Sequence, residues 1–398
     1  MFRPATYIKI EQQPSVAFPK RNTVLNFDFV THFEAVDNWR DLTNKGKITI
    51  PKNLYFRDAD NVLRPLNGTN INIGGFSSDA PLFLRGDKVS IVAGYKYFNN
   101  AHREIEETAQ FFNGYISKVG SKSPIELELE NNMWVLKQTP VPVRTFLKSD
   151  SLEKIMQFLI DQVEGKPFVI SSTTETTFGV FTTGNETAAQ AISRLQKMYG
   201  FEFYFRGNEL RGGALLYDIK SLVKENFHFQ ENIISNDLEY SRLDDVTLSA
   251  IAHNTITVNN GECKDGTPKT KKQRLEVLIT IKRLPKIGEL PYSIKEIKKG
   301  DVKPENTDGE RREFFFPGQT TIAGLAAQAY EQLKKYHYEG FKGGFTTFGL
   351  PFLRQGDNAV LADDILPERN GTYRVKEVEY SGGVDGLRQI VKIDYKIL

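Results

Sequence analysis

The chain has 398 residues, of which 39% are hydrophobic, 26% charged and 12% aromatic, and its formal net charge at pH 7 is +2. These values are typical of a soluble globular protein with room for two or three domains, and they exclude a disordered chain. The near-neutral charge excludes a strongly basic nucleic-acid coat protein, but it allows a local charged patch.

A single cysteine, Cys263, excludes an intrachain disulfide and a zinc site built from several cysteines. The start of the chain has no basic segment followed by an apolar core, so we expect no signal peptide. No stretch approaches the roughly 18 apolar residues of a transmembrane helix. We therefore expect a soluble chain without membrane insertion.

The first third of the chain alternates apolar and polar residues with a period of two, and turn residues separate the alternating segments. This pattern is typical of half-buried antiparallel strands, and several of them at this spacing predict a sandwich or barrel. The predicted strands are 5–10, 25–30, 47–50, 88–92, 114–119 and 124–129.

A helical pattern follows. Asp150 and Glu153 form a candidate capping box before apolar residues at helical spacing. A second helix is predicted over 187–199, and a β-hairpin over 201–217. The sequence therefore predicts a small α+β unit at 145–220.

Strand patterns return after this unit and continue to residue 397. Between them we expect a polar basic loop at 264–274, a long irregular polar insert at 284–313, and a helix at about 321–338. The predicted strands are 245–251, 255–258, 275–281, 372–380 and 388–397.

Two stretches of the first β region are repeated in the second. The segment 83–89 begins Phe-Leu-Arg-Gly-Asp, and 352–357 has the same residues with a glutamine inserted. An Asn-Gly pair at 113–114 is likewise repeated at 370–371. Gly and Asn suit tight turns because they tolerate positive φ, so any β protein reuses such pairs. Their shared order and flanking residues favour duplication.

The fold class predicted from these patterns is mainly β with an inserted α+β unit. Two related antiparallel β-barrels, at 1–144 and 221–398, flank the α+β unit at 145–220.

Motifs for common chemistries are incomplete. The segment 75–79 lacks the second glycine of a nucleophile elbow, 261–268 lacks the Lys-Ser/Thr of a phosphate loop, and 58–61 lacks the pattern of a calcium loop. No two histidines have metal-binding helical spacing; they are His32, His102, His228, His253 and His337. We therefore assign no catalytic, cofactor-binding or metal-binding residue. A pair of catalytic carboxylates stays open, because 50 acidic residues supply many pairs.

Three further features have simple structural interpretations. The tripeptide at 85–87 spells a cell-adhesion motif, but it is predicted to be a turn entering a strand. Cys263 is interpreted as an exposed thiol in a polar loop. A short basic run could contact phosphates, but a solvated hairpin tip is the simpler interpretation. The run comprises Lys264, Lys269, Lys271, Lys272 and Arg274.

Short motifs follow one another in a fixed order along nearly the whole chain. They are Trp39-Arg40-Asp41-Leu42-Thr43, Ile48-Thr49-Ile50-Pro51, Arg85-Gly86-Asp87-Lys88-Val89, Gly94-Tyr95, Phe112-Asn113-Gly114-Tyr115-Ile116, Pro124-Ile125-Glu126-Leu127, Asn132-Met133-Trp134, Phe348-Gly349-Leu350-Pro351, Gly356-Asp357-Asn358-Ala359-Val360, Asn370-Gly371-Thr372-Tyr373-Arg374-Val375 and Gly386-Leu387-Arg388-Gln389. In order and spacing they resemble the baseplate hub family of contractile phage tails, also called late control protein D. That family is related to the N-terminal part of type VI secretion spike proteins.

The resemblance implies a structural protein and not an enzyme. Three protomers, each contributing two barrels, would form a homotrimeric ring that matches a sixfold tail tube on one side and a threefold spike on the other. The implied partners are the tail tube protein, a separate spike protein, other baseplate proteins, and DNA that passes through the channel without sequence-specific binding. No cofactor is implied. The expected location is the virion tail or baseplate, assembled in the cytoplasm of the bacterial host.

The spike is expected to be a separate polypeptide, because the chain has no needle-like repeats after the second barrel. Two alternatives remain. One is a β-rich carbohydrate-binding or cell-surface protein, in which aromatic residues on strands form a sugar platform. The other is a cell-wall glycan hydrolase, which needs two carboxylates in a cleft.

Overall fold

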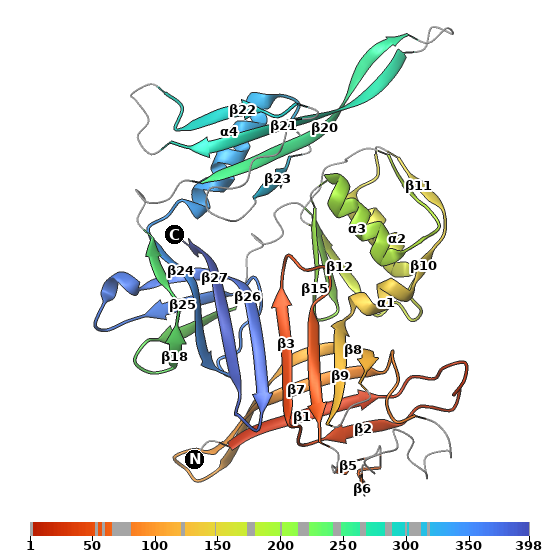
Figure 1. Cartoon of the computed structure of the whole chain (residues 1–398), viewed down its shortest axis with the longest axis vertical. Coiled ribbons are helices and arrows are strands. Elements are labelled where there is room, and N and C mark those ends of the chain that lie inside the picture. The colour runs from red at the N-terminus through yellow and green to blue at the C-terminus, as the bar shows by residue number, and fades with distance from the viewer. Residues whose placement is uncertain are drawn as a thin grey trace.

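The computed structural model of the chain describes residues 3–51, 55–57, 60–65, 81–120, 124–147, 149–172, 180–199, 201–213, 223–241, 248–262, 268–282, 289–298, 301, 312–316 and 319–397. Strands dominate, and they form one large sheet and several smaller ones (Figure 1).

In the first half of the chain, the strands pair in the order β1-β7-β8-β9-β4-β3, all antiparallel, and β2, β5 and β6 extend the sheet beyond β1. Alternate residues of β1 and β9 are buried, as the period-two pattern predicts. The strands are β1 (Arg3–Glu11), β2 (Val24–Phe27), β3 (His32–Asn38), β4 (Lys45–Ile50), β5 (Tyr55–Arg57), β6 (Leu63–Pro65), β7 (Lys88–Phe98), β8 (Glu104–Val119) and β9 (Ile125–Asn131).

The last part of the chain repeats this arrangement. Its strands pair in the order β17-β25-β26-β27-β24, and β24 then pairs with β18 and β19. In chain order, they occupy the places of β1, β3, β4, β7, β8 and β9, with β18 and β19 together in the place of β3. One difference is that β17 runs parallel to β25, whereas β1 runs antiparallel to β7. The strands are β17 (Lys224–His228), β18 (Ile233–Asn236), β19 (Glu239–Ser241), β24 (Gly340–Phe348), β25 (Asn358–Ala362), β26 (Gly371–Gly383) and β27 (Arg388–Ile397).

The two halves share one continuous sheet (Figure 1). Strand β26 pairs with β3 along 377–383 and 32–38, so the order β24-β27-β26-β3-β4-β9-β8 crosses from one half to the other. The prediction of a mainly β protein with antiparallel strands is confirmed. Among the described strands, neither half closes into a hydrogen-bonded barrel.

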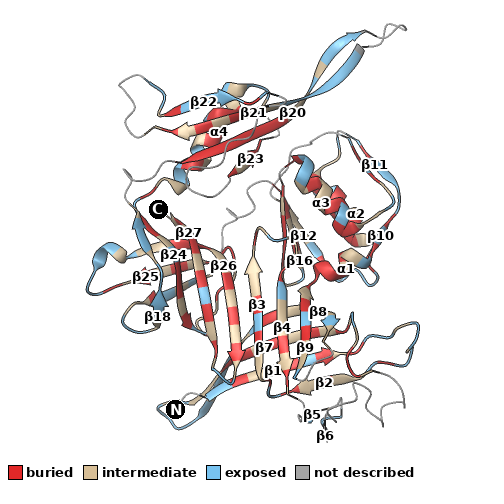
Figure 2. Cartoon of the chain, in the orientation of Figure 1, coloured by how far each residue is buried: buried red, intermediate tan, exposed pale blue. Residues whose placement is uncertain are grey.

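One hydrophobic core runs through both halves (Figure 2). The ring of Phe111 in β8 lies 4.8 Å from the ring of Phe352 and 5.2 Å from that of Tyr380 in β26, measured between centroids. Such aromatic pairs each contribute about 0.5–1.5 kcal/mol beyond their area burial. The core therefore holds the halves together as a packed unit.

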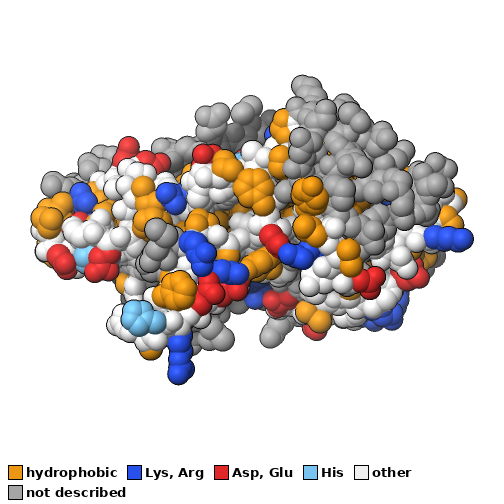
Figure 3. Space-filling view, turned by 90° about the horizontal axis from the view of Figure 1, so that it is seen from below, with side chains coloured by type: hydrophobic (Ala, Val, Ile, Leu, Met, Phe, Trp, Pro, Cys, Tyr) orange, Lys and Arg blue, Asp and Glu red, His pale blue; other side chains and the backbone are white. Residues whose placement is uncertain are grey.

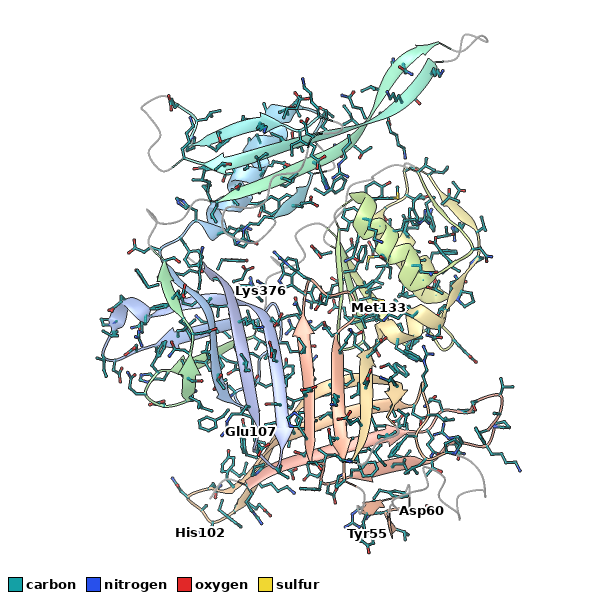
Figure 4. The ribbon with its side chains drawn as sticks, viewed as in Figure 1. Tyr55, Asp60, His102, Glu107, Met133 and Lys376 are labelled. Carbon is teal, nitrogen blue, oxygen red and sulfur yellow. The ribbon has the colours of Figure 1, made fainter. Side chains whose placement is uncertain are left out.

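The residues between the halves form an α+β unit with a separate core. Helices α2 and α3 contact the sheet β12-β16-β15, and α1 joins the same core through the buried side chains of Met133 and Leu136 (Figure 4 labels Met133). The elements are α1 (Met133–Gln138), β10 (Pro140–Val141), β11 (Arg144–Phe146), α2 (Leu152–Asp161), β12 (Val169–Ser172), β13 (Phe181–Thr183), β14 (Glu186–Thr187), α3 (Ala188–Tyr199), β15 (Glu202–Arg206) and β16 (Glu209–Gly213).

Helix α2 uses a different cap from the one predicted. Ser151 is the N-cap, and its Oγ accepts a hydrogen bond from the Lys154 N–H at 3.3 Å. Asp150 accepts one from the Leu147 N–H at 2.7 Å and closes the preceding turn. Both residue types cap helices well. The extended backbone of Ser151, with φ −79° and ψ 162°, decides between them.

A third unit lies above the second half in Figure 1. Its sheet has the order β22-β21-β20-β23, and α4 packs on it through the buried residues Leu325, Ala326 and Ala329. The elements are β20 (Ser249–Glu262), β21 (Pro268–Ile281), β22 (Tyr292–Glu296), β23 (Glu313–Phe315), α4 (Ile322–Leu333) and a following 3-10 turn (Lys334–Tyr336).

Two segments predicted as loops are partly strands. The predicted basic loop 264–274 belongs to β21 from Pro268 onward, where it pairs with β20. The predicted insert 284–313 contains β22, which pairs with β21. On the β21 side of the outer hairpin, residues 269–274 are all exposed, so no apolar alternation marks them in the sequence, whereas 255–258 on the β20 side is predicted as a strand.

Candidate functional site

A Gly-Asp turn precedes β7 in the first half. The Gly86 N–H donates to the Ile116 carbonyl at 2.8 Å, and the Ile116 N–H donates to the Asp87 carbonyl at 2.9 Å. The Asp87 carboxylate accepts a further hydrogen bond from the Leu84 N–H at 2.8 Å. Gly86 has a φ of +96°, which glycine adopts without strain.

An equivalent turn precedes β25 in the second half. The Gly356 N–H donates to the Val375 carbonyl at 2.8 Å, and the Val375 N–H donates to the Asp357 carbonyl at 2.8 Å. The Asp357 carboxylate accepts from the Arg354 N–H at 2.9 Å. Each bond has its counterpart in the first turn, so this repeated sequence is a repeated structure.

The two aspartates are buried and need a compensating positive charge. Arg21, in the segment after β1, donates to both oxygens of Asp87 at 2.8 and 2.7 Å. Arg206, at the end of β15, donates to Asp357 at 2.6 Å. The α+β unit therefore supplies to the second half the charge that the first half supplies to itself.

The β15–β16 hairpin of the α+β unit makes further contacts with both halves. The Asn132 side chain, after β9, donates to the Gly207 carbonyl at 2.8 Å. The Gln355 side chain, in the second turn, donates to the Phe205 carbonyl at 3.4 Å. Tyr204 is buried in the core shared by the halves. The hairpin thus fixes the α+β unit against both halves at once.

The repeated Asn-Gly pair is not structurally equivalent, which corrects part of the predicted echo. Asn113 and Gly114 lie inside β8, whereas Gly371 begins β26. A Cβ on Gly114 would lie 2.1 Å from the Glu130 carbonyl oxygen. Glycine is therefore needed here for the close approach of β8 and β9, and not for a turn.

Lysine and glutamate side chains cover the exposed face of the shared sheet, which we call the polar wall. They alternate with buried residues along β3, β4, β9, β26 and β27. A shallow hollow of about 650 Å3 lies on this face. The charged residues of the polar wall are Glu34, Lys45, Lys47, Lys118, Glu126, Glu128, Glu130, Glu377, Glu379 and Lys392.

Most of these charges are paired across strands. The hydrogen bonds that Lys47, Lys118 and Lys392 donate to glutamates raise the pKa of these lysines. The pairs are Lys47–Glu126 at 2.8 Å, Lys118–Glu128 at 2.7 Å, Lys137–Glu130 at 2.8 Å, Lys392–Glu377 at 2.5 Å and Lys392–Glu379 at 2.6 Å.

Two stretches of the shared sheet have one open edge among the described strands. The first is the end of β8 beyond Ile116, which pairs only with β9. The second comprises β18 and β19, which pair only with β24. In the repeated arrangement, β26 corresponds to β8, and β3 corresponds to β18 and β19. Within the chain, β26 pairs with β3, so the strands equivalent to the two open edges are paired with each other.

A carboxyl group with a shifted pKa lies where the three units meet. Burial raises the pKa of Glu202, the first residue of β15, to about 7, Arg40 after β3 lowers it, and Glu313 of β23 raises it. Phe315 of β23 packs on Phe201 at 5.1 Å between ring centroids. These residues therefore lie at an interface between the first half, the α+β unit and the third unit.

The sequence assigned no catalytic or ligand-binding residue. Cys263, Lys264 and the serine of the incomplete elbow, Ser77, lie outside the described residues. In the described part of the chain, no three His, Cys, Asp or Glu side chains are grouped to hold a metal ion. No described helix has the length and apolarity to cross a membrane. Sequence analysis missed Arg21 and Arg206, because neither lies in a motif.

No protein-family model matches the chain, and no curated protein sequence matches it. Solved structures do. The 43 kDa tail protein of prophage MuSo2 from Shewanella oneidensis has a TM-score of 0.50 and 10% identity, covering 98% of both chains. A tail protein from Neisseria meningitidis has a TM-score of 0.51 and 11% identity, covering 98% of this chain and 96% of that one.

A third structure is a type VI secretion component from Escherichia coli, at a TM-score of 0.47 and 11% identity, covering 98% of this chain and 76% of that one. The first two structures extend over nearly the full length of both chains, so the whole architecture, and not one unit of it, has known counterparts.

Proposed function

We propose that this chain, which has the fold of phage tail proteins, is a structural hub of a phage tail or a related contractile injection machine. Three copies form a ring that joins a sixfold tail tube to a threefold spike and encloses a channel. The partners are the tube protein, a separate spike protein and other baseplate proteins. The role is non-enzymatic, and the location is the virion tail, assembled in the host cytoplasm.

The observation that carries this proposal is the repeated strand order of the two halves. A chain with two equivalent units presents two equivalent surfaces, so three copies present six. Such a chain can adapt a threefold assembly to a sixfold one. In this proposal each half acts as one barrel-like unit of the ring.

The contact between the halves also supports a specific contact between protomers. Within one chain, β3 pairs with β26. By the same geometry, the β18–β19 edge of one protomer pairs with the free end of β8 in the next. Exposed strand edges invite such pairing, and a closed ring leaves none of these edges open.

The polar wall is suited to line the channel. Its lysines and glutamates neutralise one another across strands, with Lys47–Glu126 at 2.8 Å as one example. The wall has six glutamates against four lysines, so it offers phosphates no net attraction, and DNA slides past it without being held.

The two ends of the sheet carry different parts of the chain, and we assign one end to the spike and the other to the tube. The upper end in Figure 1 has the α+β and third units, which occur once per chain, so it is threefold in a trimer and fits a spike. The lower end has strand ends and turns of both halves. There Tyr55, Leu63 and Phe98 are exposed, and Figure 3 shows hydrophobic and oppositely charged side chains side by side. This end fits the tube.

Light scattering at several concentrations, with negative-stain images of the same sample, tests the proposal. We expect a mass near three times 45.2 kDa and rings with a central hole. A mass of 45.2 kDa at every concentration without rings contradicts the hub. Release of reducing ends from purified cell wall contradicts the non-enzymatic role.

A further inference from the structure

The outer part of the β20–β21 hairpin projects from the third unit as a two-stranded ribbon (Figure 1). Strand β23 pairs with β20 only along 251–253, and β22 pairs with β21 only along 277–281. Outside these ranges, the two strands have only each other among the described strands. We call residues 254–261 and 269–275 the basic arm. An isolated two-stranded hairpin is only marginally stable in water, so the arm gains stability by docking.

The lysines of the arm carry positive charge that no described carboxylate neutralises. Lys269, Lys271 and Lys272 are exposed, and none of them pairs with a described carboxylate. On the polar wall, a lysine faces a glutamate on the next strand, but in the arm Lys271 faces Val258 and Lys272 faces Thr257. The positive charge of the arm is therefore available to a partner.

This charge lies on both faces of the ribbon. Because side chains alternate along a strand, Lys269 and Lys271 lie on one face and Lys272 lies on the other. Ile256 shares the face of Lys271, two residues from its cross-strand partner. A partner that neutralises the lysines on both faces must surround the ribbon, as a groove or cleft with acidic walls does.

We propose that the basic arm docks into an acidic cleft of a different protein of the assembly. Two observations favour this partner. The half-buried aliphatic residues Ile256 and Val258 find apolar contacts in a protein cleft but few between phosphate backbones. The arm also projects from the third unit, away from the polar wall along which DNA is proposed to pass (Figure 1).

A second copy of this chain is a poorer partner. Several of its exposed carboxylates are already paired with its own basic residues. Examples are Arg3–Glu104 at 3.0 Å, Lys96–Glu106 at 3.4 Å and Lys118–Glu128 at 2.7 Å. Docking the arm there would break these pairs, so a partner with uncompensated carboxylates binds more strongly.

Fluorescence anisotropy tests the charge requirement with two labelled probes, a peptide of about 20 alternating glutamate and alanine residues and a duplex of about 20 base pairs, at about 150 mM salt. We expect the intact chain to bind the peptide and K269E/K271E/K272E to bind it at least about tenfold more weakly. The neutral variant K269Q/K271Q/K272Q should lie between them.

The matched control is K20E/K295E/K298E, which makes the same charge change at three other exposed lysines. It should bind the peptide within about twofold of the intact chain. All variants should keep the circular dichroism spectrum and solution mass of the intact chain, so this test is independent of the ring. Arm-dependent binding of DNA that is tighter than peptide binding, equal loss in the control, or no peptide binding overturns the proposal.

Discussion

Asp87 and Asp357 occupy equivalent buried positions, but arginines from different parts of the chain neutralise them. At the residue scale, this makes Arg21 and Arg206 a matched pair for mutation. The Arg21 and Asp87 side chains are 2% and 1% exposed, whereas Arg206 is 18% exposed. Water can therefore partly replace Arg206 but not Arg21.

We expect R21A to lower the free energy of unfolding by about 3–5 kcal/mol, because it leaves a buried carboxylate unpaired. R206A should lower it by about 1–3 kcal/mol. Urea unfolding measures both. Limited proteolysis separates their roles, because only R206A should expose the α+β unit to cleavage. Faster cleavage of that unit in R21A would contradict its place in the first half alone.

The raised pKa of Glu202 gives a pH dependence. The folded chain keeps this proton up to about pH 7, whereas the unfolded chain releases it near the ordinary glutamate pKa of 4.5. Stability therefore falls as pH rises from about 4.5 to 7. We expect E202Q to raise the free energy of unfolding at pH 8 by up to about 3 kcal/mol and to change it little at pH 4. Equal effects at both pH values in urea titrations would show that desolvation of the ionised carboxylate is not the cause.

At the element scale, the open edges of the shared sheet are the features that the proposed ring would use. Ile234 in β18 is 45% exposed at one of them. Ile294 in β22 is 40% exposed on the edge strand of the third unit, which the ring contact does not involve. The same substitution at these two positions therefore compares a ring edge with an unrelated edge.

We expect I234K to weaken trimer formation at least tenfold, because a lysine on an edge strand disfavours pairing with another strand. I294K should leave it unchanged. Sedimentation equilibrium measures both, and thermal unfolding of the monomeric fraction checks that each variant folds. Equal weakening by the two variants would exclude the β18–β8 contact as the joint between protomers.

At the scale of the whole molecule, parts present twice and parts present once have different consequences for assembly. In the proposed ring, the repeated strands would give an approximate sixfold symmetry, whereas the α+β unit and the third unit would each be present three times. A permanent ring needs an interface of the obligate class, which buries on the order of 2,000 Å2 or more. We expect each protomer contact to reach this area in an electron-microscopy reconstruction. Contacts of only a few hundred Å2 would contradict a stable hub.

The sequence by itself determined the local structure and the repeated Gly-Asp turn. Period-two alternation marks a strand wherever one face is buried, as in β1 and β9, and helical spacing marks α2, α3 and α4. These signals lie within a few neighbouring residues, so a single chain displays them without an alignment. The same signal is absent from 269–274 of β21, because all of these residues are exposed.

Only the tertiary structure decided which segments meet. The pairing of β3 with β26 joins residues that are more than 300 positions apart, and Arg206 reaches Asp357 across 151 positions. Backbone pairing leaves no mark on residue type, and an arginine that neutralises a buried aspartate looks like any other in the sequence. The polar wall could be identified only in the structure. Alternation in the sequence separates the two faces of a strand, but it does not say which faces of neighbouring strands lie together.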